Sequence, residues 1–147
     1  MCGICGYLNL NLQPPPDAGL LGRMSSRLTH RGPDSDGVFH RPGVELAVRR
    51  LSIIDLETGD QPLANEAGDV TLIYNGEIYN YRELRKDLIA RGHSFHTKSD
   101  GEVICHLYEE QGADCLGELN GMFALALWDE RRRRLLLARD RAGEKPL

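Results

Sequence analysis

The order of its strand-like and helical segments limits this chain to a mixed α and β fold. Segments with strand character come in adjacent pairs, as at residues 38–40 and 44–49, and helical segments stand in blocks between such pairs. A regular alternation of strand and helix, which would predict a parallel sheet, does not fit this order. At 147 residues the chain has the length of one domain. We therefore expect a single α+β domain, residues 1–147, with helices on the outer faces of its sheets.

The hydrophobic pattern places the individual elements. Strands are expected at residues 2–10, 38–40, 44–49, 70–74, 122–128 and 135–139, and helices at 18–28, 79–91 and from 99 onwards. The second helix carries Leu84, Leu88 and Ile89 on one face and ends at Gly92, a typical C-terminal cap. Ser99 and Glu102 have the spacing of a capping box at the start of the third. The basic run 131–134 suits the solvated tip of a hairpin.

Composition excludes several classes of function. A net charge of −4 and a pI near 5.7 disfavour a nucleic-acid-binding protein, which usually carries a basic surplus. No segment approaches the roughly 18 consecutive apolar residues that a membrane span needs. Residues 1–13 lack the charged start and the cleavage site of a secretory signal. We expect a cytoplasmic protein that binds neither nucleic acid nor membrane.

The four cysteines do not form a recognisable metal or disulfide pattern. Cys2 and Cys5 stand as C-x-x-C, but a zinc site would need a second pair at similar spacing, and Cys105 and Cys115 are ten residues apart. A redox motif would stand at the start of a helix, whereas Cys5 lies within a predicted strand. We expect no metal site, and we interpret Cys2 as functional and Cys5 as packed.

Cys2 directly follows the initiator methionine. Removal of Met1 would leave a residue that carries both a thiol and a free α-amino group. An α-amino group has a pKa of about 7.7–8.0, so a substantial fraction is neutral near pH 7–8 and can accept the thiol proton. Nucleophile and general base would then belong to one residue, as in N-terminal threonine enzymes. A cysteine at this position by chance is the alternative.

Asn75 and Gly76 follow the strand predicted at 70–74. An Asn-Gly pair is usually a tight turn. At the end of a strand, however, it can offer a side-chain amide and an accessible backbone N–H, which are the two donors of an oxyanion hole. Glu77 would add a carboxylate beside them.

Arg50 and Asp100 could recognise the two charged groups of a free amino acid. A guanidinium can bind a substrate carboxylate through two parallel hydrogen bonds, although Arg50 could equally be an exposed arginine at a strand end. Asp100 could bind an ammonium group, or it could stabilise the dipole of the helix that starts there. With Cys2 and Asn75, this set suits acyl transfer from an amino acid with a side-chain carbonyl.

Longer motifs resemble the class II glutamine amidotransferases, and specifically the N-terminal glutaminase domain of glutamine-hydrolysing asparagine synthetases. Related glucosamine-phosphate and purine amidotransferases differ within these motifs, with a tyrosine in place of Pro33, for example. The resemblance covers essentially the whole chain and implies a four-layer αββα sandwich of the N-terminal-nucleophile hydrolase type. The motifs occur in the family's order at residues 2–4, 30–34, 50–55, 61–63, 74–80, 99–100 and 121–124.

The resemblance also implies roles for the matching residues. Cys2 would attack the side-chain amide of L-glutamine and form a glutamyl thioester, while Asn75 and Gly76 would bind the oxyanion. The substrate's α-carboxylate and α-amino group would be bound by the remaining site residues, which are Arg50, Leu51, Ile53, Glu77 and Asp100.

The end of the chain departs from the family's pattern. Ala142 and Glu144 replace apolar residues, and we expect weaker packing there if these sites are buried. The family's synthetase domain, with its ATP and magnesium sites, is not in this sequence, so we expect a truncated domain without cofactors of its own. A missing part of the sheet would expose an edge and favour homodimers. The alternatives are an inactive interaction or regulatory module, and a glutaminase subunit that serves another acceptor.

Overall fold

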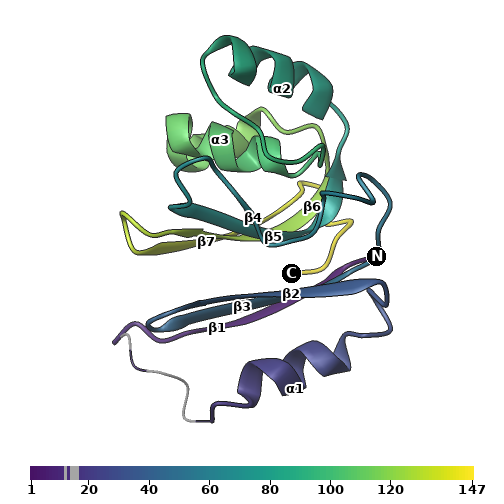
Figure 1. The fold of residues 1–147 in the computed structure, drawn as a ribbon, viewed down its shortest axis with the longest axis vertical. Helices are drawn as coiled ribbons and strands as arrows, with labels where there is room; N and C mark the ends of the chain where they lie inside the picture. The colour runs from purple at the N-terminus through teal and green to yellow at the C-terminus, as the bar shows by residue number, and fades with distance from the viewer. Residues whose placement is uncertain (12, 14–16) are drawn as a thin grey trace.

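The computed structural model describes residues 1–11, 13 and 17–147 and has four layers (Figure 1). Helix α1, a three-stranded sheet, a four-stranded sheet, and helices α2 and α3 follow one another from one side to the other. Residues 12 and 14–16, between the first predicted strand and the first predicted helix, lie outside the described residues. The α+β architecture and the αββα layering expected from the sequence are confirmed.

Antiparallel strands form both sheets. The first sheet has the order β1-β3-β2, and the second has the order β4-β5-β6-β7. The strands are β1 (Gly3–Leu8), β2 (Ser35–Arg41), β3 (Val44–Arg50), β4 (Leu63–Ala64), β5 (Val70–Ile78), β6 (Gly121–Asp129) and β7 (Arg134–Arg139). The helices are α1 (Leu20–Arg27), α2 (Tyr81–Ala90), α3 (Glu102–Gln111) and a short 3-10 helix, η1 (Gly112–Gly117).

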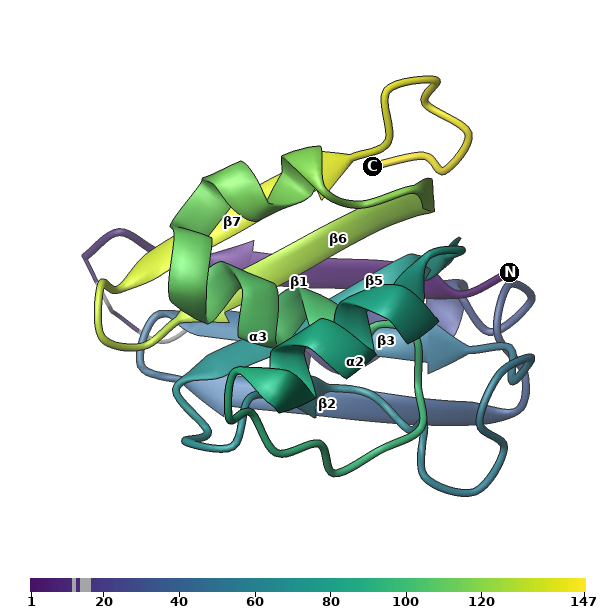
Figure 2. The ribbon, with the colours of Figure 1, turned by 90° about the horizontal axis from the view of Figure 1, so that it is seen from above.

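Two hydrophobic cores hold the layers together. The core between the sheets consists of β3 side chains packed against Ile73, Ala126 and Trp128. The larger core lies between the second sheet and the helices, and Figure 2 shows α2 and α3 side by side over that sheet. Residues 102–108 of α3 are buried on all sides, so this helix is an interior element. Burial of apolar surface in both cores supplies the main driving force for the fold.

Strand β5 is longer than the sequence pattern predicts. The interpretation of Asn75-Gly76 as a turn or a strand end is wrong, because both residues continue the strand opposite Ala124 and Phe123. Pairing with the long strand β6 extends β5 to Ile78, and this tertiary pairing overrides the turn preference of Asn-Gly. The two residues therefore lie in a rigid sheet.

Three local predictions need correction. Ile89 is 52% exposed, so only Leu84 and Leu88 of the predicted face reach the core. Ser99 and Glu102 form no capping box: α3 begins after Gly101, and the Glu102 side chain bonds to residues before the helix. Ala142 and Glu144 are both exposed, so the packing loss that burial would cause does not apply here.

The basic run lies in the turn between β6 and β7, as predicted. Arg131 pairs with Asp69, and Arg132 pairs with Asp129 at 2.9 Å. Among the described residues, no helix is long and apolar enough to cross a membrane.

The buried Glu102 carboxylate fixes the loop before α3. It accepts hydrogen bonds from the backbone N–H groups of His96 (2.7 Å) and Thr97 (2.8 Å), and from the Thr97 hydroxyl. Burial alone would raise the pKa of Glu102, but the nearby His106 ring (3.6 Å) and hydrogen bonds from Thr97 and the backbone outweigh it and lower the pKa to about 2. The ionised carboxylate is therefore a structural group.

We expect Glu102→Gln to destabilise the domain by about 2–3 kcal/mol at pH 7, because the amide cannot accept all of these bonds. The Glu102 pKa is lower in the folded chain than in the unfolded one. Its contribution is thus complete above the ordinary carboxyl pKa of 4.5 and is lost as the pH falls towards 2. Urea unfolding of both proteins between pH 7 and 3 would measure this. Equal stability at pH 7 would contradict the assignment.

Candidate active site

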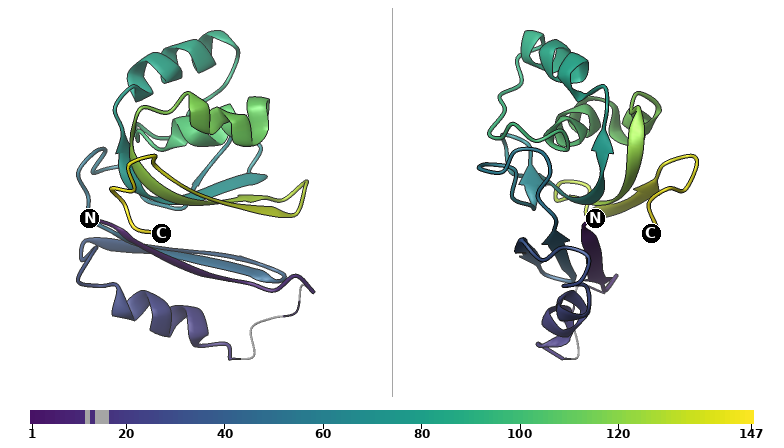
Figure 3. Two further views of the ribbon diagram at one scale, coloured as in Figure 1. Left: turned by 180° about the vertical axis from the view of Figure 1, so that it is seen from behind. Right: turned by 90° about the vertical axis from the view of Figure 1, so that its right-hand side faces the viewer.

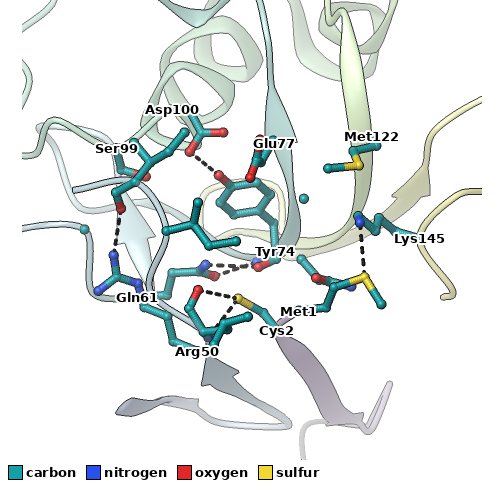
Figure 4. A pocket seen from close by; sticks show the side chains of 16 residues that line it. Met1, Cys2, Arg50, Gln61, Tyr74, Glu77, Ser99, Asp100, Met122 and Lys145 are labelled. Carbon is teal, nitrogen blue, oxygen red and sulfur yellow. Dashed lines mark hydrogen bonds between the residues drawn. The ribbon is translucent and has the colours of Figure 1, made fainter. Parts of the chain in front are cut away.

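One cavity of about 100 Å³ contains the whole predicted site. Its lining residues include the start of β1, the end of β3 and part of strand β5, and Figure 4 shows their side chains around the cavity. All eight residues predicted from the sequence line it: Cys2, Arg50, Leu51, Ile53, Asn75, Gly76, Glu77 and Asp100. The remaining lining residues are Met1, Ile54, Gly59, Gln61, Tyr74, Ser99, Met122 and Lys145.

Backbone groups of Leu51 hold the Cys2 thiol in the cavity. The Leu51 N–H donates to Cys2 Sγ at 3.4 Å, and the thiol donates to the Leu51 carbonyl oxygen at 3.7 Å. Both chain ends lie at the level of the space between the two sheets (Figure 3). There, Lys145 Nζ contacts the Met1 thioether sulfur at 3.2 Å. Loss of Met1 would therefore widen the cavity and leave the Cys2 amine inside it.

The other cysteines are protected by their surroundings. Cys2 packs toward the inter-sheet core, and Cys5, three positions along the strand, points to the opposite face. Burial raises the pKa of the Cys5 thiol, against the opposing effect of Arg49. Burial also raises the pKa of Cys105 well above its ordinary value and that of Cys115 to about 12. Thiolate formation is thus disfavoured at the three cysteines outside the cavity.

An open edge of β5 supplies a backbone donor. The backbone N–H of Tyr74 donates to the Gln61 side chain (2.7 Å), and that of Ile78 donates to Asp100 (2.7 Å), both away from β6. Backbone groups two residues apart face the same side of a strand, so the Gly76 N–H points to this edge, between those two bonds. The Gly76 N–H is therefore on the part of this edge that lines the cavity.

Gly76 must be a glycine because β6 is close. A Cβ atom at this position would lie 2.3 Å from the Met122 carbonyl oxygen and 2.7 Å from Phe123 Cα. On the other face of β5, Ile73 packs between the sheets, and Asn75 and Glu77 follow it at a spacing of two. The Asn75 side chain, only 4% exposed, therefore faces the sheet that carries Cys2.

Arg50 forms a buried, pre-positioned cationic wall of the cavity. Its Nη1 donates to Asp60 Oδ1 at 2.8 Å, and its Nη2 donates to the carbonyl oxygens of Ile54 (2.9 Å) and Asp55 (2.7 Å). The Arg50 side chain is 6% exposed, so the interpretation as an exposed arginine at a strand end is wrong. The loop at residues 51–60 therefore holds the Arg50 guanidinium in place, and Arg50 still lines the cavity.

Asp100 lies under the cavity at the start of α3. Its carboxylate accepts hydrogen bonds from the Tyr74 hydroxyl and from the backbone N–H of Ile78. Burial raises its pKa, although these two bonds act in the opposite direction. Burial and the neighbouring carboxylate raise the pKa of Tyr74 well above its ordinary value, so the phenol keeps its proton and donates.

Several cavity residues had no role in the sequence-based interpretation. Gln61 substitutes for a strand neighbour, because its side chain bonds both the N–H and the carbonyl oxygen of Tyr74 (2.7 and 3.0 Å). Lys145 is buried and lines the cavity beside Met1. Gln61 lies in the motif at residues 61–63, but only the folded backbone brings Gln61 and Lys145 to Cys2.

Comparison with known proteins places the chain in a family. A family model described as "Glutamine amidotransferase domain" matches residues 1–147. Asparagine synthetase [glutamine-hydrolyzing] 3 of Bacillus subtilis is 47% identical over 99% of this chain and 24% of the relative. Asparagine synthetase [glutamine-hydrolyzing] of Sandersonia aurantiaca is 46% identical over 100% of this chain and 28% of the relative. The chain thus spans roughly a quarter of these relatives' length.

A solved structure agrees with the fold. Glutamine phosphoribosylpyrophosphate amidotransferase from B. subtilis, complexed with ADP and GMP, superposes with a TM-score of 0.52 at 25% identity. The match covers 67% of this chain and 24% of that one. The N-terminal-nucleophile fold expected from the sequence is thereby confirmed. From the family match over its whole length, this chain belongs to the glutamine amidotransferase domain family.

Proposed function

We propose that this domain hydrolyses L-glutamine to glutamate and ammonia, with Cys2 as the nucleophile after removal of Met1. The observation that carries the proposal is the convergence of eight sequence-predicted residues on one cavity. These residues come from four separate parts of the chain, at residues 2, 50–53, 75–77 and 100. If only the architecture of the fold had been retained, these eight residues would not be expected to lie together.

The reaction proceeds by acyl transfer to sulfur. The neutral α-amine of Cys2 takes the thiol proton, and the sulfur attacks the side-chain amide carbon of glutamine. Collapse of the tetrahedral intermediate breaks the C–N bond, and the protonated amine returns its proton to the departing nitrogen, which leaves as ammonia. Water then attacks the glutamyl thioester, and the thiol is restored with release of glutamate. The thiol, amine and oxyanion donors supply these steps, so the hydrolysis itself needs no cofactor.

Two donors from β5 stabilise the intermediate. The Asn75 side-chain amide and the Gly76 N–H would bind the oxyanion, and each lies in a strand paired along its whole length with β6. Donors held rigidly before the reaction need no reorganisation when charge develops, and loss of one typically costs about 10²–10³ in rate. The extension of β5 through Ile78 is therefore favourable for catalysis.

Charged groups recognise the two ends of the free amino acid. Arg50 would bind the α-carboxylate, with backbone groups near Leu51 and Ile53 completing that side of the cavity. Glu77 and Asp100 would face the α-ammonium group. This arrangement selects a substrate with both charges at a fixed distance from the amide.

The ammonia would pass to a second domain or subunit. Because the relatives are named glutamine-hydrolysing asparagine synthetases, we propose that the acceptor is aspartate, amidated with ATP and magnesium bound outside this domain. We further propose a cytoplasmic location and a capacity to form homodimers. The intact cavity weighs against an inactive module, and the acceptor is determined outside this chain.

A glutamine-analogue diazoketone should label Cys2. We expect intact-mass measurement to show loss of Met1 and a single adduct, and we expect Cys2→Ala to abolish the adduct while Cys5→Ala keeps it. Cys5 is the matched control because burial raises its pKa on the opposite face of β1. Loss of Met1 without an adduct would refute the proposal in favour of the inactive module.

Replacement of Arg50 by lysine should weaken glutamine binding. Lysine keeps the charge but loses the paired hydrogen bonds, so we expect KM to rise by roughly 10- to 100-fold with a smaller change in kcat. Arg49→Lys is the matched control, because Arg49 bonds to Ser25 and Asp36 outside the cavity (3.1 and 3.4 Å). Equal effects of the two substitutions on KM would contradict the role of Arg50.

A further inference from the structure

A second cluster of ligand-type side chains lies away from the glutamine cavity. Glu66 comes from the turn between β4 and β5, His93 from the loop after α2, and His106 and Glu109 from α3 (Figures 1 and 2). One nitrogen or carboxylate oxygen from each of the four residues lies within 4.8 Å of the others. None of them lines the Cys2 cavity.

His106 is the unusual member of this cluster. Its side chain is fully buried, with 0% exposed, yet neither ring nitrogen has a well-aligned hydrogen-bond partner. Nδ1 lies 2.8 Å from Glu66 Oε2, and Nε2 lies 3.6 Å from Glu102 Oε1. The contact between Nδ1 and Glu66 is short, but the carboxylate oxygen does not lie along the direction of the ring N–H. The two atoms are therefore close without forming a hydrogen bond. Buried polar groups are normally satisfied, and such an exception needs a cause.

The surroundings favour a cation. Glu66 spans the two imidazoles, with Oε1 3.1 Å from His93 Nδ1 and Oε2 near His106. Glu110 Oε1 lies 3.0 Å from His93 Nε2 and also pairs with Arg91. Together with Glu102 and Glu110, the cluster thus brings four carboxylates close to two imidazoles.

The supporting contacts resemble those around bound metals. A ligating histidine usually donates its second ring N–H to a carboxylate, and Glu110 is placed to accept it from His93. Ligating carboxylates are themselves hydrogen-bonded, and Asn65 Nδ2 donates to Glu109 Oε2 at 3.0 Å. His106 and Glu109 are three residues apart on α3, which places them on one face of the helix.

We propose that Glu66, His93, His106 and Glu109 bind a divalent transition-metal ion of the zinc class. Two imidazoles and two carboxylates suit zinc, whereas magnesium and calcium prefer oxygen ligands alone. Four protein ligands leave no open position, so the ion is structural and not catalytic. It ties α3 to the β4–β5 turn and to the loop after α2. The sequence-based expectation of no metal site considered only cysteine spacing.

Zinc binding should be measured on the full chain after chelator treatment, by competition with a chromophoric chelator. Cys2→Ser serves as the background, because an accessible thiol also binds zinc. We expect one equivalent of zinc to bind and to raise the Tm. His93→Gln and Glu109→Gln should each weaken zinc affinity by at least tenfold. His96→Gln is the matched control, since His96 is an exposed histidine of the same loop outside the cluster.

Cobalt provides an independent readout of the ligands. A bound Co²⁺ ion should show tetrahedral visible absorption without a thiolate charge-transfer band, and His93→Gln should remove that absorption. Absence of zinc binding, or equal binding by Cys2→Ser and by Cys2→Ser with His93→Gln, would overturn the proposal and leave a metal-free ion-pair network. In the chain that keeps Cys2, labelling by the diazoketone should be unchanged by His93→Gln, so the two proposals fail independently.

Discussion

The antiparallel pairing of β5 with β6 is the constraint on which the rest of the structure depends. This pairing places β5 inside the second sheet. One edge of β5 is hydrogen-bonded to β6, and the other edge has no partner strand towards the C-terminal end of β5. Side chains on one face of β5 enter the core under α3, and those on the other enter the core between the sheets. A single strand therefore organises both cores and the wall of the cavity.

Where β4 stops, side chains replace it as partners of β5. Gln61 bonds both backbone groups of Tyr74, and Asp100 accepts the N–H of Ile78. Because β4 pairs with only two residues of β5, the edge beyond it would otherwise carry unpaired backbone groups. Polar side chains thus cover this edge of the sheet, and two of them, Gln61 and Asp100, line the proposed glutamine site.

The sequence predicted the elements with strong periodicity and missed those that depend on distant partners. The helices and the β6–β7 hairpin carry their signals locally, so their patterns were sufficient. Asn75-Gly76 has a local turn preference that the long partner strand overrides. The two-residue strand β4 and the 3-10 helix η1 are too short to produce a period. Ser99 and Glu102 had the right spacing for a capping box, but Glu102 is used by the preceding loop instead.

The site was easier to predict than its supports. Cys2, Arg50 and Asn75 have chemistry that is recognisable from residue type, and family motifs named their neighbours. Gln61 acts by bonding the backbone of Tyr74, and Lys145 is buried beside Met1, and residue type alone predicts neither contact. The same limit explains why the histidine and glutamate cluster stayed hidden: its members are 27, 13 and 3 residues apart, from Glu66 to His93, His106 and Glu109. Only the packing of α3 against two loops brings them together.

Helix α3 links the two polar regions of the molecule. Asp100, just before its first turn, bonds Tyr74 and Ile78 at the cavity, while His106 and Glu109 lie further along in the cluster. Glu102 stands between them and bonds the loop of residues 96–97. Apolar packing of residues 102–108 holds α3 in the interior, and directional polar contacts near both ends fix its rotation and its position along its own axis. The placement of Asp100 under the cavity therefore depends on contacts made along the whole helix.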